Sequence, residues 1–179
     1  QTLVLAEKAA RLDDTEPEDA RRWHRSEAVL GRGTYGMVFE GIDSVTGEIF
    51  AVKQVDSSVF RPKAVKALQR EMEMLRMLQH VNIVRYKGME ICENKLSLFM
   101  ELCPGGSISN VLDTFGALSY LNVRNYTFQI VAGLDYLHRH CIVHRDVKCA
   151  NALLNSHGVV KLADFGASQW LSNPSTGSL

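Results

Sequence analysis

The order of hydrophobic and polar residues divides the chain into regions that predict different structures. Residues 1–25 are rich in charge, and Thr15-x-x-Glu18, with Pro17 between them, predicts a short capped helix that ends at Arg25. We interpret this region as a linker or a regulatory flank. Beyond it, short runs of β-branched and aromatic residues are separated by glycine, which is typical of β-strands.

Five strands and one helix are predicted for the region that follows. The helix spans residues 63–79, because four apolar residues recur there with helical spacing: Leu68, Met72, Leu75 and Leu78. The strands are expected at Ala28–Arg32, Met37–Asp43, Ile49–Val55, Ile83–Tyr86 and Leu96–Leu102. This order predicts an antiparallel sheet with the helix inserted between its third and fourth strands.

The second half of the chain is predicted to be mainly helical from about Gly105. Ser119 is placed to cap a long helix, whose apolar stripe consists of Val123, Tyr126, Ile130, Leu134 and Leu137. Two short runs with strand character, Ala152–Leu154 and Val159–Leu162, flank a turn at residues 156–158. We therefore expect a short strand pair after the long helix.

The composition is that of an ordinary soluble globular protein, since 46% of the 179 residues are hydrophobic and 22% are charged. Twenty basic residues balance twenty acidic ones, so we expect neither nucleic acid nor an anionic membrane as a partner. No apolar run approaches the roughly 18 residues of a membrane-spanning helix. The four cysteines lack metal-binding spacing, which favours reduced thiols and a cytoplasmic location.

Three glycines form the motif Gly31-x-Gly33-x-x-Gly36-x-Val38, which is a weak signal when taken alone. The same glycine spacing occurs in dinucleotide-binding folds, where the glycines open a helix. Here residues 37–40 continue as a strand, so we expect the loop to join two strands and to leave backbone N–H groups open to phosphate oxygens. A plain glycine-rich hairpin is the alternative.

Lys53 follows two apolar residues on a predicted strand, where a lysine needs a partner. Glu71 is the preferred partner, because it lies beside the apolar stripe of the predicted helix. The ion pair would hold the ammonium group where it can contact the α and β phosphates of a nucleotide. Glu73 is turned away from this stripe by its spacing. Taken singly, such a lysine is more often at a sheet edge, and such a glutamate is more often solvated.

The loop at residues 144–151 has the sequence His-Arg-Asp-Val-Lys-Cys-Ala-Asn and is the most specific pattern in the chain. In a phosphoryl-transfer site, Asp146 would accept the proton of the attacking hydroxyl and Lys148 would steady the transferred group. Asn151, together with Asp164 of the later tripeptide Asp-Phe-Gly, would bind Mg²⁺. Taken alone, His-Arg-Asp or Asp-Phe-Gly is more often a chance sequence in a surface loop than a functional site. Their order after the glycine loop and the strand lysine argues against coincidence.

With these motifs in this order, residues 28 to about 171 resemble the protein kinase family. The resemblance implies a bilobal α+β fold with a five-stranded antiparallel N-lobe and a helical, incomplete C-lobe. A flank at 1–25 would precede a kinase domain at 26–179, in which the N-lobe covers about 26–102 and a partial C-lobe covers 103–179. The chain starts without Met and ends within a polar stretch, so we expect a fragment truncated in the activation segment.

The resemblance makes residues 144–151 the catalytic loop, and Lys148 in this loop matches the serine/threonine pattern. Residues 100–108 and 161–168 are similar to MAP kinase kinase kinases. This resemblance implies ATP as the phosphoryl donor, Mg²⁺ as the cofactor, a protein substrate such as a MAP kinase kinase, and an upstream activator. It also implies Met100 as the gatekeeper. The ATP-binding residues would be Leu30, Gly31, Gly33, Gly36, Val38, Ala51, Lys53, Met100, Glu101, Cys103 and Leu153, with Glu101 and Cys103 contacting adenine through their backbone.

Two alternatives remain beside an active kinase. A pseudokinase that serves as a scaffold would be favoured if Lys53, Asp146 or Asp164 were replaced, and none is. A truncated product would bind nucleotide weakly and leave the apolar face of the 119–140 helix partly uncovered. If the protein is regulated as the resemblance implies, Arg145 pairs with a phosphorylated residue, either one beyond the chain or one among Ser168, Ser172, Ser175, Thr176 and Ser178.

Overall fold

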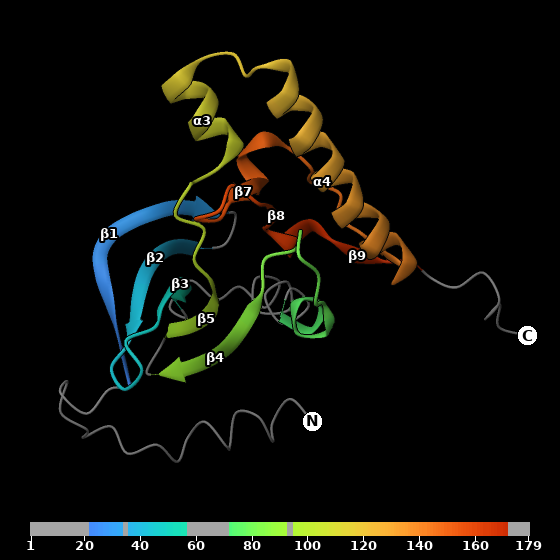
Figure 1. Ribbon diagram of the computed structural model, residues 1–179. Coiled ribbons are helices and arrows are strands. Elements are labelled where there is room, and N and C mark those ends of the chain that lie inside the picture. Colours follow the sequence, from blue (N-terminus) through green and yellow to red (C-terminus); the bar gives the residue numbers. More distant parts are fainter. Residues whose placement is uncertain (1–21, 34–35, 57–71, 93–94, 172–179) are drawn as a thin grey trace, which may run out of the picture. The chain divides into compact units, whose positions relative to one another are not determined.

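The computed structural model describes residues 22–33, 36–56, 72–92 and 95–171, and they form two compact units (Figure 1). Unit 1 contains the described residues up to Asp56 together with Lys87–Leu102. Unit 2 contains the described residues from Met72 to Tyr86 together with those from Cys103 onward. The first unit is built on a sheet, and the second is built on helices and short strand pairs.

Unit 1 contains most of a five-stranded sheet with the order β1-β2-β3-β5-β4. Its strands are β1 (Trp23–Gly33), β2 (Gly36–Asp43), β3 (Ile49–Asp56), β4 (Tyr86–Cys92) and β5 (Lys95–Glu101). The pairs β1–β2, β2–β3 and β3–β5 are antiparallel. The predicted five-stranded sheet is confirmed, and β2, β3 and β5 begin within one residue of the expected positions.

β1 starts earlier than predicted, and the expectation of a helix up to Arg25 is wrong for its last residues. Trp23 pairs with Asp43 of β2, and its indole Nε1 donates a hydrogen bond of 2.6 Å to Glu90 of β4. The Trp23 ring also packs edge-on against Phe99, with 5.0 Å between the ring centroids. These nonlocal contacts outweigh a weak local preference for helix. The earlier part of the predicted helix lies outside the described residues.

The predicted strand Ile83–Tyr86 is also wrong, because β4 begins only at Tyr86. Ile83 is 1% exposed and forms a parallel bridge with Leu162 of unit 2. The amide N–H of Val84 donates to the Leu162 carbonyl at 2.9 Å. The apolar run is therefore buried within unit 2, a destination that its hydrophobicity alone does not distinguish from a sheet.

The predicted helix before this run is confirmed where the structure describes it. Residues 72–77 are helical. Two members of the predicted apolar stripe, Leu75 and Leu78, are 1% and 5% exposed. Leu78 follows the helix and donates its amide N–H to the Leu75 carbonyl at 3.2 Å. Leu68 lies outside the described residues.

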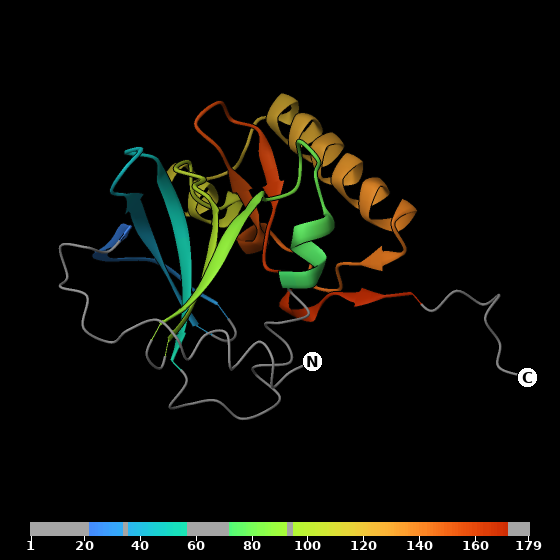
Figure 2. The ribbon, with the colours of Figure 1, turned by 90° about the horizontal axis from the view of Figure 1, so that it is seen from below.

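Besides the 72–77 helix, unit 2 contains α3 (Ile108–Phe115), α4 (Tyr120–Arg139) and two antiparallel strand pairs. The pairs are β6 (Ile142–Val143) with β9 (Gln169–Trp170), and β7 (Ala152–Leu154) with β8 (Val160–Leu162). Short 3-10 turns, η3 (Cys149–Asn151) and η4 (Phe165–Ala167), precede β7 and β9. Figure 2 shows α4 beside β8, against which it packs. The strand pair predicted after the long helix is confirmed.

Both helices begin at serine residues whose side chains satisfy an otherwise unpaired N–H group. The Ser107 hydroxyl accepts a 3.1 Å hydrogen bond from the Asn110 amide at the start of α3. The Ser119 hydroxyl accepts a 3.3 Å hydrogen bond from the Asn122 amide at the start of α4. The predicted cap of the long helix is therefore confirmed.

The long helix α4 buries one face against α3 and the β7–β8 pair. A cluster of Ile108, Ala152, Leu154 and Val160 is covered by Val111, Leu118, Tyr126 and Ile130. Tyr126 and Ile130 belong to the predicted stripe, and Leu137 from the same stripe is fully buried. Val123, at the start of the same stripe, is 48% exposed, so the stripe is covered only from Tyr126 onward. Val123 lies in the first turns of α4, before the helix reaches this cluster.

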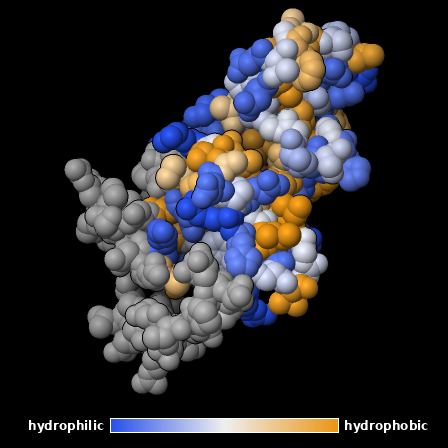
Figure 3. Space-filling view, turned by 90° about the vertical axis from the view of Figure 1, so that its left-hand side faces the viewer, coloured by the Kyte–Doolittle hydropathy of each residue, from blue (hydrophilic) through white to orange (hydrophobic). Residues whose placement is uncertain are grey.

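Apolar side chains also reach the surface of both units. Leu30 of β1 is 50% exposed and Met37 of β2 is 41% exposed, whereas Phe115 of α3 and Phe128 of α4 are each more than 70% exposed. Figure 3 shows hydrophobic areas (orange) separated by hydrophilic areas (blue) on one face of the molecule. Leu30 is thus accessible to a ligand on the strand that leads into the glycine loop.

Candidate active site

The glycine motif lies where β1 meets β2. Gly31 pairs with Val38, and Gly33 pairs with Gly36. A Cβ atom on Gly36 would lie 2.2 Å from the Gln54 carbonyl oxygen on β3, so no other residue fits there without displacing the backbone. The loop joins two strands, as predicted, and this arrangement excludes the dinucleotide-binding alternative, in which a helix follows the glycines.

Four predicted nucleotide-binding residues share one face of the sheet. Side chains alternate along a strand, so Ala51 and Lys53 of β3 point to the same side. Val38 of β2 is directly opposite Lys53, and Met100 of β5 is directly opposite Ala51. Residues directly opposite one another in neighbouring strands share a face. The structure therefore brings Val38, Ala51, Lys53 and Met100 together.

Lys53 is 3% exposed, which is rare for a lysine and agrees with a positioned rather than a solvated ammonium group. Its predicted partner Glu71 lies outside the described residues, so the ion pair remains a prediction. Glu73, the alternative partner, is exposed. Glu101 is opposite Phe50 and hence on the other face of the sheet, so only its backbone remains the predicted contact for adenine.

The segment after β5 lies against β7 within unit 2. The Gly106 amide N–H donates to the Cys103 carbonyl at 3.1 Å and closes a tight turn. The Gly105 amide N–H then donates to the Leu154 carbonyl at 2.9 Å. A Cβ atom on Gly105 would lie 2.8 Å from the Leu154 Cβ, so the close approach needs glycine. The turn that starts at Cys103 is thus placed beside the strand that carries Leu153.

The three polar residues predicted in the catalytic loop form one hydrogen-bonded network. The Lys148 ammonium group donates to both oxygens of Asp146, at 3.1 Å and 2.8 Å. The Asn151 side-chain amide donates to Asp146 Oδ2 at 2.8 Å and to the Asp146 carbonyl at 2.9 Å. The loop therefore fixes the orientation of the Asp146 carboxylate through two neighbours that sequence analysis had predicted to act with it.

This network keeps Asp146 ionised. The hydrogen bond from Lys148 is the main cause that lowers the pKa of Asp146 below its usual value, and the hydrogen bond from Asn151 acts in the same direction. A carboxylate with a lowered pKa is a weak base, so it is better suited to orient a hydroxyl group and take up its proton late in a transfer. Because the Lys148–Asp146 pair is partly exposed, we assign it little stability.

His144 connects the catalytic loop to the segment before Asp164. It is 1% exposed, and its Nε2 lies 3.0 Å from the Ala163 carbonyl. Its Nδ1 accepts a hydrogen bond of 3.3 Å from the Asp146 amide. Burial lowers the pKa of His144, which favours the neutral ring that these two contacts require. The His144 ring also packs on Phe165 with 4.9 Å between the centroids.

The two predicted metal ligands are joined through the backbone. The Ala163 amide N–H donates to the Asn151 carbonyl at 2.9 Å, which holds Asp164 next to the catalytic loop. Asp164 has φ of 61°, in the left-handed region that aspartate tolerates better than most residues. Because the Asn151 amide nitrogen faces Asp146, its side-chain oxygen points elsewhere. A carboxylate and an amide oxygen fit Mg²⁺, which prefers oxygen ligands.

Arg145 and Ser168 are tied to neighbouring residues in the described part of the chain. Arg145 has φ of 66°, and its Nη1 donates to the Gln169 side-chain oxygen. The Ser168 hydroxyl donates to the His144 carbonyl at 3.1 Å. The other predicted phosphorylation candidates, from Ser172 onward, lie outside the described residues. Pairing of Arg145 with a phosphate remains a prediction.

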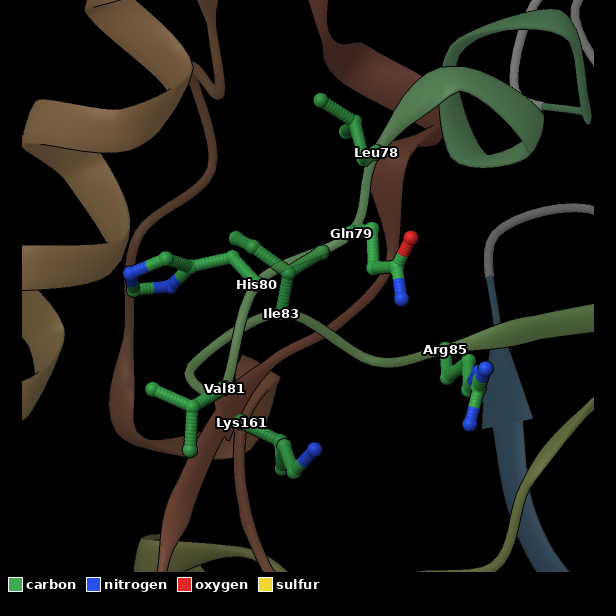
Figure 4. Close-up of a pocket in the computed structure, with 7 residues that line it drawn as sticks. All are labelled: Leu78, Gln79, His80, Val81, Ile83, Arg85 and Lys161. Atoms are coloured by element: carbon green, nitrogen blue, oxygen red, sulfur yellow. The ribbon is translucent and has the colours of Figure 1, made fainter.

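A cavity of about 260 Å³ lies in unit 2, and none of the predicted site residues lines it (Figure 4). Its lining comes from the segment after the 72–77 helix and from β8, and consists of Leu78, Gln79, His80, Val81, Ile83, Arg85 and Lys161. The sequence patterns predict a helix and a strand in this segment but assign it no functional role. The sequence feature that marks this segment is Asn82, a polar residue within an apolar run. A buried polar side chain requires hydrogen-bond partners, so Asn82 indicates that other residues pack against the segment.

Comparison with known proteins gives the class of the chain. Residues 24–178 match the family described as the protein kinase domain. The chain therefore belongs to the protein kinase family, as the order of its motifs had indicated. No helix in the described residues is both long and apolar enough to cross a membrane.

Within this family the chain is similar to mitogen-activated protein kinase kinase kinases. It is 44% identical over 156 residues to mitogen-activated protein kinase kinase kinase A of Dictyostelium discoideum, and the alignment covers 84% of this chain and 16% of that protein. It is 46% identical over 159 residues to mitogen-activated protein kinase kinase kinase 19 of Mus musculus, and the alignment covers 87% of this chain and 12% of that protein. It is 42% identical over 161 residues to mitogen-activated protein kinase kinase kinase 2 of Arabidopsis thaliana, and the alignment covers 87% of this chain and 25% of that protein. The chain thus spans a quarter or less of the length of these relatives.

Proposed function

We propose that the protein transfers the γ-phosphoryl group of ATP to a serine or threonine hydroxyl of a protein, and that its substrate is a MAP kinase kinase. The observation that carries this proposal is the network in which Lys148 and Asn151 both hold the Asp146 carboxylate. The similarity to MAP kinase kinase kinases supports the choice of substrate. The four free cysteines agree with a reducing, cytoplasmic location.

In the proposed reaction, the hydroxyl oxygen of the substrate forms a bond to the γ-phosphorus as the bond from that phosphorus to the bridging oxygen of ADP breaks. Asp146 orients the hydroxyl and receives its proton. Lys148 lies close enough to Asp146 to donate to the transferred group as well, since an ammonium group carries three donors. Positioning and electrostatics supply most of the rate enhancement in such transfers.

The remaining residues would bind the nucleotide and its metal. Mg²⁺, when bound, neutralises charge that develops on the phosphates. Asn151 and Asp164 would be its ligands, and Lys53 would contact the α and β phosphates. Leu30, Val38, Ala51, Met100 and Leu153 would surround the adenine ring, with the glycine loop of Gly31, Gly33 and Gly36 over the phosphates. Glu71 would hold Lys53 in place.

The proposal is tested by incubating the full-length protein with Mg²⁺, ATP and a catalytically inactive MAP kinase kinase. We expect phosphate on serine or threonine of the substrate, and we expect Asp164→Asn to abolish it while the circular dichroism spectrum stays unchanged. Tyrosine phosphorylation, or wild-type turnover by Asp164→Asn, would refute the proposed role. Nucleotide binding without transfer by the wild-type protein would instead favour a scaffold.

A further inference from the structure

Asn82 is a buried polar residue in the segment that joins the 72–77 helix to β4. It is 4% exposed and lies among the apolar residues Val81, Ile83 and Val84. Its side-chain amide donates two hydrogen bonds, one to the Val160 carbonyl at 2.9 Å and one to the Gln129 side-chain oxygen at 3.2 Å. A buried amide with both contacts satisfied fixes the position of the groups that it touches.

Gln129 of α4 completes the contact from the other side. The same side-chain oxygen that accepts from Asn82 also accepts a 2.8 Å hydrogen bond from the Val160 amide. Both backbone polar groups of Val160, its N–H and its carbonyl, are therefore bound by the side chains of Gln129 and Asn82. We call this pair of side chains the Asn82–Gln129 clamp.

The backbone next to the clamp extends this connection along β8. The Leu162 amide N–H donates to the Asn82 carbonyl at 2.9 Å, and the Leu162 carbonyl accepts from the Val84 amide at 2.9 Å. Leu162 is followed directly by Ala163 and Asp164. The strand that delivers Asp164 is thus held by a helix, α4, and by the segment after another helix.

We propose that the Asn82–Gln129 clamp positions Asp164 for Mg²⁺, so that Asn82 and Gln129 are positioning residues for the metal. The inference rests on the proposed function, in which Asp164 is a ligand. Mg²⁺ demands nearly ideal octahedral geometry, so a small displacement of a ligand weakens binding strongly. The clamp holds Val160, four residues before Asp164, so a shift of β8 would move Asp164 directly.

Tyr136 provides a matched control, because it joins the same helix to the same segment through Gln79 and His80. Its hydroxyl accepts a 3.0 Å hydrogen bond from the Gln79 amide, and its ring stacks on His80 with 4.7 Å between the centroids. Figure 4 shows His80 directed toward α4, while Lys161 projects from β8 on the other side of the segment. Loss of the Tyr136 hydroxyl should weaken packing but leave β8 in place.

The test measures binding of a fluorescent ADP by the full-length protein while Mg²⁺ is titrated, together with hydrogen exchange of residues 159–166. For Gln129→Met we expect the half-maximal Mg²⁺ concentration to rise about tenfold, the lower range for loss of a residue that supports metal ligands. Exchange at Val160 and Leu162 should become faster. Gln129→Glu keeps the accepting oxygen and should restore the wild-type midpoint. Gln129→Asn, which is shorter by one methylene, replaces Gln129→Met if the latter does not fold.

Tyr136→Phe should lower the melting temperature but shift the Mg²⁺ midpoint by less than about twofold, within the range of a surface change. A wild-type midpoint in Gln129→Met, or in Gln129→Asn where that variant replaces it, would overturn the inference alone. An equal shift in Tyr136→Phe would also overturn it, since any loss of stability would then suffice. Nucleotide binding by the wild-type protein that is independent of Mg²⁺ would overturn the inference together with the proposed function.

Discussion

The Asn151 side-chain amide donates a 2.8 Å hydrogen bond to Asp146 Oδ2, and this contact links the predicted metal ligand to the predicted proton acceptor. Asn151 is 7% exposed, so the hydrogen bond is sheltered from competing water. The same carboxylate also accepts from the Lys148 ammonium group, whose side chain is 54% exposed. The charge on Asp146 is therefore set by its neighbours, and changes to them should be visible in its titration.

Removal of Lys148 should raise the pKa of Asp146. The Lys148 hydrogen bond is the main cause of the lowered pKa, so in Lys148→Met the carboxyl group should titrate nearer to the usual value of about 3.9. The measurement is a ¹³C NMR titration of the Asp146 carboxyl carbon. Lys87→Met, which removes a lysine paired with Glu48 in unit 1, serves as the control and should leave the titration unchanged. Identical titration of Asp146 in both variants would contradict the assigned cause.

His144 should make stability depend on pH. Burial is the main cause that lowers its pKa, so the folded protein keeps the ring neutral while the unfolded chain binds a proton below about pH 6.5. This stabilisation is present above that pH and is lost as the pH falls toward the folded pKa. Relative to His144→Phe, the wild-type protein should lose up to about 1.4 kcal/mol of unfolding free energy per pH unit in this range.

Chemical denaturation at pH values between about 7.5 and 5.5 measures this difference. His157→Asn is the matched control, because His157 is exposed in the turn between β7 and β8. This control should retain the pH dependence of the wild-type protein. If His144→Phe also retained it, another group would be responsible.

Gly36 and Gly31 should respond differently to the same substitution. A Cβ atom on Gly36 would lie 2.2 Å from the Gln54 carbonyl oxygen, whereas a Cβ atom on Gly31 would meet nothing within 4 Å. Gly36→Ala should therefore reduce the free energy of unfolding by about 1–3 kcal/mol, the usual result of forcing extra volume into a packed site. Gly31→Ala should change it by less than about 0.5 kcal/mol. Equal effects in thermal unfolding experiments would show that the loop can shift to accept a side chain.

Lys53→Met should reduce phosphoryl transfer far more than it reduces folding. Lys53 is 3% exposed on the face shared with Val38 and Ala51, and methionine keeps most of its volume. Loss of a positioned cation near the transferred charge should lower kcat/KM by about 10²- to 10³-fold, equivalent to roughly 3–4 kcal/mol. Steady-state kinetics of the full-length protein measures this effect, with Lys87→Met as the control. Activity preserved in Lys53→Met would refute the phosphate-contact role.

Local patterns were sufficient to predict much of unit 1. The alternation of apolar and polar residues set β2 and β3 to within one residue, because strands with one face buried follow a period of two. They were insufficient at Trp23, where contacts with Glu90 and Phe99 extend β1. They were also insufficient at Ile83, whose bridge to Leu162 spans much of the chain. Partners distant in sequence leave no local periodicity.

The candidate site likewise contains residues that local motifs predict and residues that they do not. The motifs named Asp146, Lys148 and Asn151 as a group, and the structure brings these three residues into one network. The roles of Asn82 and Gln129 could not be derived in this way, because their contact joins residues 47 positions apart. A polar residue in an apolar run indicates that a partner is needed but does not identify it.

The two tryptophans of the chain are divided between the two units. Trp23 lies in the aromatic cluster with Phe50 and Phe99, whereas Trp170 on β9 is 39% exposed. Each unit therefore carries its own intrinsic fluorophore, one partly buried against two phenylalanine rings and the other exposed. With Trp170→Phe the emission of unit 1 is observed alone, and with Trp23→Phe that of unit 2, so the two halves can be followed separately as they unfold.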